Sequence, residues 1–247
     1  MKLLPILAIT LLVIACNEKN TELTAQQIVD KSIVNACQGN CEHATIDFTF
    51  RDRRYVSKRD GGAYSLERII SDSTGVTHDV VTNDGFTRFK NDSLVKVPDS
   101  MVTRYSNSVN SVHYFAQLPF GLNAPAVNKK LLGEDIINGE PYYEVGVTFK
   151  EEGGGTDFED EFVYWIHKDR FTVDYLAYSY ATDGGGIRFR EAYNPREVEG
   201  IRFVDYNNYK PNSKDIALTT LDSLFQSKEL KLLSKIETEN VGVRLQQ

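Results

Sequence analysis

The sequence predicts a mainly β, antiparallel fold with a helix near its N-terminus, and three patterns carry this prediction. Apolar and small side chains recur at the helical period over residues 25–36. From Ala44 to Arg51 they alternate with polar side chains, as in a strand with one buried face. Turn sequences rich in Asn, Asp and Gly then follow about every ten residues, the spacing typical of an antiparallel meander.

The composition is that of a packed globular protein. The chain has 247 residues, of which 41% are hydrophobic and 26% are charged, and its formal net charge is −7. These values exclude a disordered chain, a collagen-like chain and a membrane protein with several spans. An acidic balance without a basic run also argues against nucleic-acid binding, which needs Lys and Arg side chains that displace counterions from phosphates.

The N-terminus has the pattern of a secretory signal peptide over residues 1–15. Its apolar run from Leu3 to Ala15 has about 13 residues, whereas a membrane-spanning helix needs roughly 20. The run ends in Val13-Ile14-Ala15-Cys16, which resembles the bacterial lipobox. That resemblance implies cleavage before Cys16 and acylation of its sulfur. An ordinary secretory signal that is cut elsewhere is the alternative.

An acylated Cys16 would hold the protein on a membrane of the cell envelope, either on its periplasmic face or at the cell surface. The polar residues 16–23 are expected to form a lipidated tether. Asn17 stands where many lipoproteins that stay in the inner membrane carry an Asp, so its identity favours the outer membrane.

The two remaining cysteines, Cys37 and Cys41, predict a disulfide. A continuous helix would hold their Cβ atoms about 5–6 Å apart, whereas a disulfide needs about 3.8 Å. Gly39 and Asn40 interrupt the helix, and an oxidising periplasm permits the bond. So short a loop should contribute only about 2 kcal/mol of stability. One alternative is a pair of free thiols. The other is a metal site formed by Cys37, Cys41 and His43, for which the nearby sequence offers no fourth zinc ligand.

The first half of the expected fold follows from the order of these patterns. Residues 25–36 are expected to form a helix with Thr24 and Gln27 as its capping box. The segment 44–51 follows as the first strand. The stretch from Tyr142 to Tyr209 predicts consecutive strands joined by hairpins, because turn sequences separate its apolar runs.

Two further helices are expected between the strands. Residues 99–116 have apolar side chains at helical spacing, although their Ser, Asn, Val and Tyr content makes a weak isolated helix, so packing must hold it. An apolar loop, residues 118–122, follows. Residues 216–226 have the same helical spacing, and a last strand is expected over residues 230–241. No repeat, low-complexity tract or Pro-rich linker divides the chain, so one domain is expected over residues 24–247.

A set of motifs runs through most of the mature chain. They are Tyr114-Phe115, Leu118-Pro119-Phe120-Gly121-Leu122, Gly153-Gly154-Gly155 with Asp160 and Phe162, Tyr164-Trp165-Ile166, Tyr175-Leu176-Ala177-Tyr178, Gly186 with Arg188-Phe189-Arg190, and Gly200-Ile201-Arg202-Phe203. These motifs resemble an uncharacterised lipoprotein family of Bacteroidota, a domain of unknown function. The architecture resembles the superfamily of bacterial lipoprotein carriers that includes LolA, LolB and LppX-like proteins. This resemblance implies a strongly curved, incompletely closed antiparallel half-barrel sheet, short helices that plug its concave face, and an apolar interior that binds acyl chains.

Aromatic side chains are the candidates for the wall of such a cavity. The strand 162–166 carries apolar side chains on both faces, so both faces must be covered. Packing of a filled core explains this pattern as well as a ligand cavity does. The candidate cavity residues are Tyr105, Phe115, Phe120, Tyr164, Trp165 and Tyr178.

Three arginines are candidates for binding an anionic head group. Arg188 and Arg190 share one face of a strand, and Arg202 lies on the next strand, beside the expected apolar pocket. The alternative is structural, because the expected hairpin register brings Asp205 near Arg188 as a cross-strand ion pair.

No arrangement typical of catalysis occurs in the sequence. It contains neither Gly-x-Ser-x-Gly nor His-Glu-x-x-His, and its histidines are scattered singly. We therefore expect neither an enzyme nor a cofactor. Acidic residues around Gly153-Gly154-Gly155 offer weak calcium candidates in Asp157, Glu159 and Asp160, and a solvated hairpin tip is the alternative.

Two functions are compatible with these features. The first is a membrane-anchored lipoprotein, expected to be a monomer, that binds a hydrophobic, acyl-like ligand in the half-barrel cavity. The second is a non-enzymatic envelope module that binds a protein or glycan through its Gly-rich loops at residues 153–155 and 184–186.

Overall fold

The computed structural model describes residues 22–155 and 157–246. Cys16 and the signal peptide expected over residues 1–15 lie outside these residues, as does most of the expected tether. Within the described ranges, no helix is both long enough and apolar enough to cross a membrane.

In the described part of the chain, fourteen strands form two antiparallel sheets of seven strands each. Sheet A runs in the order β14 (Thr238–Leu245), β1 (Ala44–Phe50), β2 (Arg53–Asp60), β3 (Ala63–Asp72), β4 (Gly75–Thr82), β5 (Gly85–Lys90) and β6 (Ser93–Val95). Sheet B runs in the order β13 (Lys231–Ile236), β12 (Ile201–Lys210), β11 (Gly186–Val198), β10 (Val173–Tyr180), β9 (Glu161–His167), β8 (Glu140–Phe149) and β7 (Val127–Ile137). Strands β8 to β12 confirm the expected meander.

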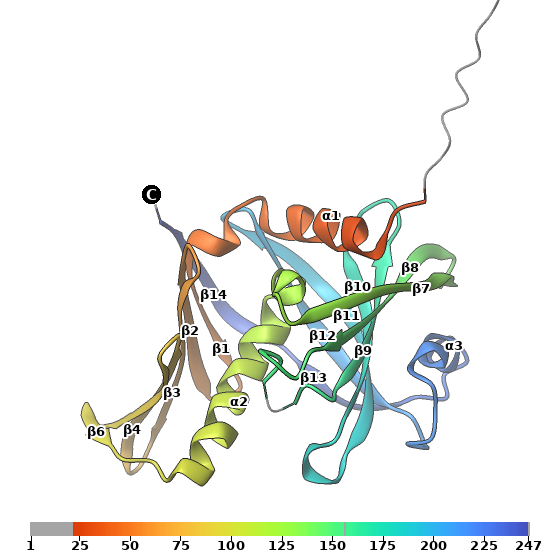
Figure 1. The fold of residues 1–247 in the computed structure, drawn as a ribbon. Helices are drawn as coiled ribbons and strands as arrows, with labels where there is room; N and C mark the ends of the chain where they lie inside the picture. Colours follow the sequence, from red (N-terminus) through yellow and green to blue (C-terminus); the bar gives the residue numbers. More distant parts are fainter. Residues whose placement is uncertain (1–21, 156, 247) are drawn as a thin grey trace, which may run out of the picture.

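The two sheets are joined at one corner by β13 and β14. Only Glu237 separates these strands, yet β13 pairs with β12 in sheet B and β14 pairs with β1 in sheet A (Figure 1). Asp205 holds the bend, because its Oδ1 accepts hydrogen bonds from Thr238 N (3.0 Å) and from Arg196 Nη2 (3.1 Å). The expectation of one last strand over residues 230–241 is therefore wrong.

The half-barrel is open at its other side. Among the described residues, no strand pairs with the outer edges of β6 and β7, so the sheets curve around a hollow without closing it. The expected half-barrel is confirmed, with the difference that its strands belong to two sheets joined at the β13–β14 corner.

Helix α1 (Ala25–Cys37) confirms the expected N-terminal helix and its capping box. Thr24 Oγ1 accepts a hydrogen bond from Gln27 N (3.2 Å), and Gln27 Oε1 accepts one from Thr24 N (2.9 Å). The helix buries Ile28 and Val29 completely and lies across one end of sheet B (Figure 1). The disulfide Cys37–Cys41 that ends this region is present, with the two Cα atoms 5.3 Å apart.

Helix α2 (Asp99–Ala116) lies between the two sheets and packs against β3 and β4 of sheet A (Figure 1). The fully buried Val109 and His113 mark its contact face. The Nε2 atom of His113 donates a hydrogen bond to the Glu67 carbonyl (3.0 Å), and burial lowers the pKa of His113 to about 4. A neutral histidine therefore fixes α2 on sheet A, and the opposite face of the helix is left toward sheet B.

Helix α3 (Leu221–Gln226) is shorter than the expected 216–226 and follows a 3₁₀ turn at Leu218–Thr220. It covers the outer face of sheet B, where the ring of Phe225 lies 5.1 Å from that of Phe189. Trp165 packs in this outer layer, and its neighbour Tyr164 packs in the inner layer. Sheet B is therefore covered on both faces, as its doubly apolar strand predicts.

Candidate functional site

A cleft of about 1040 Å³ lies between α2 and the concave face of sheet B. Its walls come from α2, from β8 to β13 of sheet B and from the loop at residues 150–160, and Phe50 and Thr238 of sheet A also line it. Near its C-terminal end α2 also contacts sheet B, where the hydroxyl groups of Tyr114 and Tyr164 lie 2.6 Å apart. Ligand sites are typically about 300–1,000 Å³, so this cleft is large enough for one sizeable small molecule.

One end of the cleft is aromatic. The Phe162 ring is at its centre, with ring centroids 5.3 Å from Tyr178, 5.7 Å from Phe149 and 6.3 Å from Phe115. Aliphatic side chains of Val204 and Ile236, together with Tyr206, extend this apolar wall.

The other end of the cleft is polar and charged. Helix α2 contributes hydroxyl, amide and guanidinium groups, and the loop between β8 and β9 contributes carboxylates. These residues are Ser100, Thr103, Arg104, Asn107, Asn110, Asp157 and Asp160. A cleft with one aromatic end and one polar end suits an amphiphile better than a uniformly apolar molecule.

Arg190 lies at the apolar end and is only 7% exposed. Its Nη2 donates a hydrogen bond to the Tyr178 hydroxyl (2.8 Å), and its guanidinium carbon lies 3.7 Å from the centre of the Phe115 ring. Its Nε and Nη1 atoms have no hydrogen-bond partner among the described residues. Residues 22–155 and 157–246 also offer this side chain no carboxylate within ion-pair distance.

The other two candidate arginines have different surroundings. Arg188 lines the cleft, is half-buried, and donates a hydrogen bond from Nη1 to the Ile187 carbonyl (2.8 Å). Arg202 lies outside the cleft lining and pairs with Asp174 (3.6 Å). The expected pairing of Arg188 with Asp205 is wrong, because the register of β11 and β12 places Asp205 opposite Tyr193.

The six aromatic candidates divide between four regions. Phe115 and Tyr178 line the cleft. Tyr164 is fully buried in the inner layer, where its hydroxyl bonds to that of Tyr114 (2.6 Å). Trp165 lies in the outer layer, and therefore it does not line the cleft.

Tyr105 and Phe120 lie on the sheet A side of the molecule. Tyr105 stacks on Phe86 of β5, with the ring centroids 6.0 Å apart, and Phe120 lies 5.0 Å from the guanidinium of Arg59. Neither residue is part of the cleft lining. Phe149, Phe162 and Tyr206 line the cleft but were not among the candidates from the sequence. For Phe162 a signal was present, because it shares a strand face with the candidate Tyr164.

The acidic loop closes the polar end of the cleft. Asp157 Oδ2 accepts a hydrogen bond from Asn107 Nδ2 of α2 (3.0 Å), which ties the loop to the helix. Burial, together with the charge of Asp157, raises the pKa of Asp160 to about 6. Within the described ranges, no three His, Cys, Asp or Glu side chains are grouped so that they could hold a metal ion.

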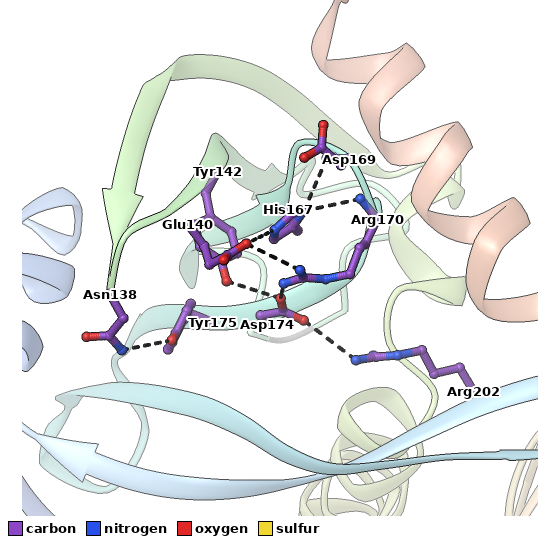
Figure 2. A network of polar contacts seen from close by, with 9 residues as sticks. All are labelled: Asn138, Glu140, Tyr142, His167, Asp169, Arg170, Asp174, Tyr175 and Arg202. Atoms are coloured by element: carbon purple, nitrogen blue, oxygen red, sulfur yellow. Dashed lines mark hydrogen bonds and ion pairs between the residues drawn. The ribbon is translucent and has the colours of Figure 1, made fainter.

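A network of polar contacts surrounds His167, at the end of β9 (Figure 2). His167 Nδ1 accepts hydrogen bonds from the backbone N–H groups of Asp169 and Arg170, both at 3.1 Å, and Nε2 donates to Glu140 Oε2 (2.8 Å). Asp174 joins the network by pairing with Arg170 (3.3 Å). Because both ring nitrogens of the buried His167 are engaged, this imidazole is arranged to hold a turn rather than to act as a base.

A second group of acids lies on the outer face of sheet B, away from the cleft. Burial and the charges of Asp222 and Asp135 raise the pKa of Glu144 to about 7. The Oε1 atom of Glu144 has no hydrogen-bond partner among the described residues. The folded protein therefore binds this proton more tightly than the unfolded chain, so Glu144 makes the fold less stable as the pH rises from about 4.5 to about 7.

We expect Glu144→Gln to raise the melting temperature at about pH 8, and this gain should fade toward about pH 4.5, where the native Glu144 is already protonated. Thermal unfolding followed by circular dichroism at both pH values measures the difference. Glu152→Gln, at an exposed loop position, should change little at either pH. A gain that is equal at both pH values would show that the charge of Glu144 is not the cause.

The open antiparallel half-barrel with an amphipathic cleft under a helix places the chain in the LolA-like class of folds. A LolA superfamily protein from Nitrosomonas europaea is similar to it at a TM-score of 0.51 and 13% identity, over 92% of this chain and 95% of that one. A DUF1329 family protein from Desulfovibrio piger is similar at a TM-score of 0.55 and 13% identity, over 88% and 92%. No curated protein matches the sequence. The chain belongs to the DUF6503 family, a family of unknown function whose model matches residues 2–238.

Proposed function

We propose that this chain is a lipoprotein of the cell envelope, anchored through acylated Cys16, that binds a hydrophobic, acyl-like ligand in the cleft between α2 and sheet B. The observation that carries the proposal is the aromatic end of the cleft, where rings from α2, β8, β9 and β10 surround one space. Water in contact with so many rings is unfavourable, and an acyl chain would replace it.

The architecture supports this proposal in a second way. Helix α2 is fixed by its contacts with sheet A, while its cleft side carries mainly small and polar side chains. Contacts with both sheets, including that of Tyr114 with Tyr164 (2.6 Å), hold this helix in place as a wall of the cleft. A LolA superfamily protein shares this open half-barrel, which supports the cleft as the place for a ligand.

Native mass spectrometry of the full chain, purified from its own membranes in an uncharged detergent, tests ligand binding. The proposal predicts an added mass of one hydrophobic small molecule per chain, which organic solvent extracts. A protein that carries no added mass, and that takes up no acyl compound when one is supplied, would contradict the proposal. Capture of an envelope protein or glycan through the loops at residues 153–155 and 184–186 would support the alternative module.

Metabolic labelling with an alkyne-bearing palmitate tests the anchor. We expect the full chain to incorporate the label and Cys16→Ala to lose it, because no other residue of the sequence lies at the end of the lipobox-like run. The double variant Cys37→Ser/Cys41→Ser is the matched control and should keep the label, since these cysteines are bonded to each other. Unlabelled native protein would exclude acylation.

A further inference from the structure

The buried guanidinium of Arg190 is the feature of the cleft that the binding of a plain hydrocarbon does not explain. Arg68, which is 4% exposed, has Asp79 at 2.7 Å as a counter-ion. Arg190, which is 7% exposed, donates a hydrogen bond to the phenol of Tyr178 and lies against aromatic rings, and it has no counter-ion among the described residues. Burial of a charge without a counter-ion is unfavourable, and an arginine keeps its charge at any physiological pH.

The geometry around Arg190 is suited to one small anion. Tyr178 accepts a hydrogen bond from Nη2, so its own hydroxyl hydrogen is free to point elsewhere, and Nε and Nη1 are donors without partners. A guanidinium edge with a nearby phenol presents donors that match the two oxygens of a carboxylate. A phosphate brings three strong acceptor oxygens and more charge than this one cation balances.

We infer that the ligand is an anionic amphiphile whose carboxylate binds Arg190 and Tyr178, while its hydrocarbon tail lies along Phe149 and Phe162. This inference rests on the proposed function and names the chemical class of its ligand. The carboxylate supplies the charge that Arg190 lacks. The tail occupies the aromatic end of the cleft.

Two details of the site follow from this inference. Nε and Nη1 are shielded from solvent, so side chains at the edge of the guanidinium move aside when the carboxylate enters, whereas the ring of Phe115 covers the flat face of the guanidinium at 3.7 Å and can stay in place. Arg188 contributes less, because it is half-buried, and a backbone carbonyl already accepts from its Nη1.

Competition binding on the full chain in an uncharged detergent tests the inference. Radiolabelled dodecanol is the tracer, and laurate, methyl laurate and dodecyl phosphate are the competitors, at about pH 8, where the laurate carboxyl is ionised. We expect laurate to displace the tracer at a concentration about tenfold or more below that of methyl laurate, because hydrogen bonds to charged groups are strong. Dodecyl phosphate should compete less well than laurate.

Variants of the site identify the cation. Arg190→Met should remove the preference for laurate and leave methyl laurate unaffected, and Tyr178→Phe should reduce the preference in part. Arg54→Met removes one positive charge from the exposed surface of sheet A and should keep the preference in full. Circular dichroism establishes that each variant is folded, and Arg190→Lys, which keeps the charge but not the fork of donors, should be intermediate if Arg190→Met does not fold.

The outcomes separate the inference from the proposed function. If the tracer binds, but laurate and methyl laurate compete equally, the carboxylate inference is overturned and the proposed function stands. If dodecyl phosphate competes best, the head group is a phosphate and the inference is overturned as well. If the native protein binds neither the tracer nor any competitor, the proposed function itself fails. A preference that survives in Arg190→Met would assign the anion to another residue.

Discussion

Replacement of Asp79 with alanine is expected to lower the free energy of unfolding by about 3–5 kcal/mol, the largest change we predict for a single side chain. Asp79 is fully buried, and its carboxylate pairs with Arg68 (2.7 Å) and Arg88 (2.6 Å). Its removal leaves two guanidinium groups near each other without a counter-ion. Urea denaturation of the full chain measures the loss.

Asp79→Ala should also disturb the cleft, because it weakens the contacts that hold α2 in place. Arg68 Nη1 also donates a hydrogen bond to Ser108 Oγ of α2 (2.6 Å), so the ion network helps to hold the helix that forms one wall of the cleft. Burial alone would raise the pKa of Asp79, but hydrogen bonds from Arg88 and Arg68 outweigh it and keep this pKa below its usual value. The contribution of Asp79 is therefore present at neutral pH and is lost as the pH falls through that lowered pKa.

Asp52→Ala is the matched control for this variant, since Asp52 is exposed and pairs with its neighbour Arg53 (3.5 Å). It should change the free energy of unfolding by no more than about 0.5 kcal/mol. A loss below about 1 kcal/mol for Asp79→Ala would mean that the buried network does not hold α2 on sheet A.

Ser111→Trp is expected to weaken ligand binding strongly while the protein stays folded. Ser111 is an exposed residue of α2 that lines the cleft, so a large indole at this position fills ligand space without disturbing a packed core. The affinity for an acyl ligand should fall by about tenfold or more, because the tail loses its place against the aromatic wall. The free energy of unfolding should change by no more than about 0.5 kcal/mol.

Ser111→Ala is the control at the same position and should bind as the native protein does, because it keeps the side chain small. Equilibrium binding of radiolabelled dodecanol to the full chain compares the three proteins. Native affinity in Ser111→Trp would show that the ligand lies somewhere other than the cleft.

Most of the correct predictions about the fold came from local sequence patterns. The periodicity over residues 25–36 and the Thr24–Gln27 capping box predicted α1, because both signals depend only on neighbours in the sequence. The disulfide Cys37–Cys41 followed from a short loop with a helix break. The meander from β8 to β12 followed from turn sequences, which also act locally.

Long-range features could not be read in the same way. The change of sheet at Glu237 depends on which strands β13 and β14 pair with, and no turn sequence marks it. The partner of Asp205 depends on the turn at Glu199-Gly200, which pairs Val198 with Ile201 and so excludes Arg188, and on an irregularity between Tyr193 and Arg196, which moves the pairing by one residue to Tyr193.

The side chains that line the cleft were also hard to predict from the sequence, because their positions depend on long-range packing. Tyr164 and Trp165 are neighbours on a strand, so they necessarily face opposite layers, and the sequence does not say which layer holds the cleft. Tyr105 and Phe115 belong to one helix, but only packing decides which of them faces sheet A. The missing counter-ion of Arg190 likewise emerges only when its neighbours are placed in space.

Site mapping with a photoreactive acyl probe tests the central claim most directly. Laurate that carries a diazirine at the end of its hydrocarbon tail is added to membranes that contain the full-length protein. After illumination, peptide mass spectrometry locates the labelled residues. Our account predicts labels on the segments that carry Phe149 and Phe162, and their loss in Ser111→Trp. Labels confined to exposed apolar side chains of edge strands, such as Leu94 and Leu232, with an unlabelled cleft, would contradict it.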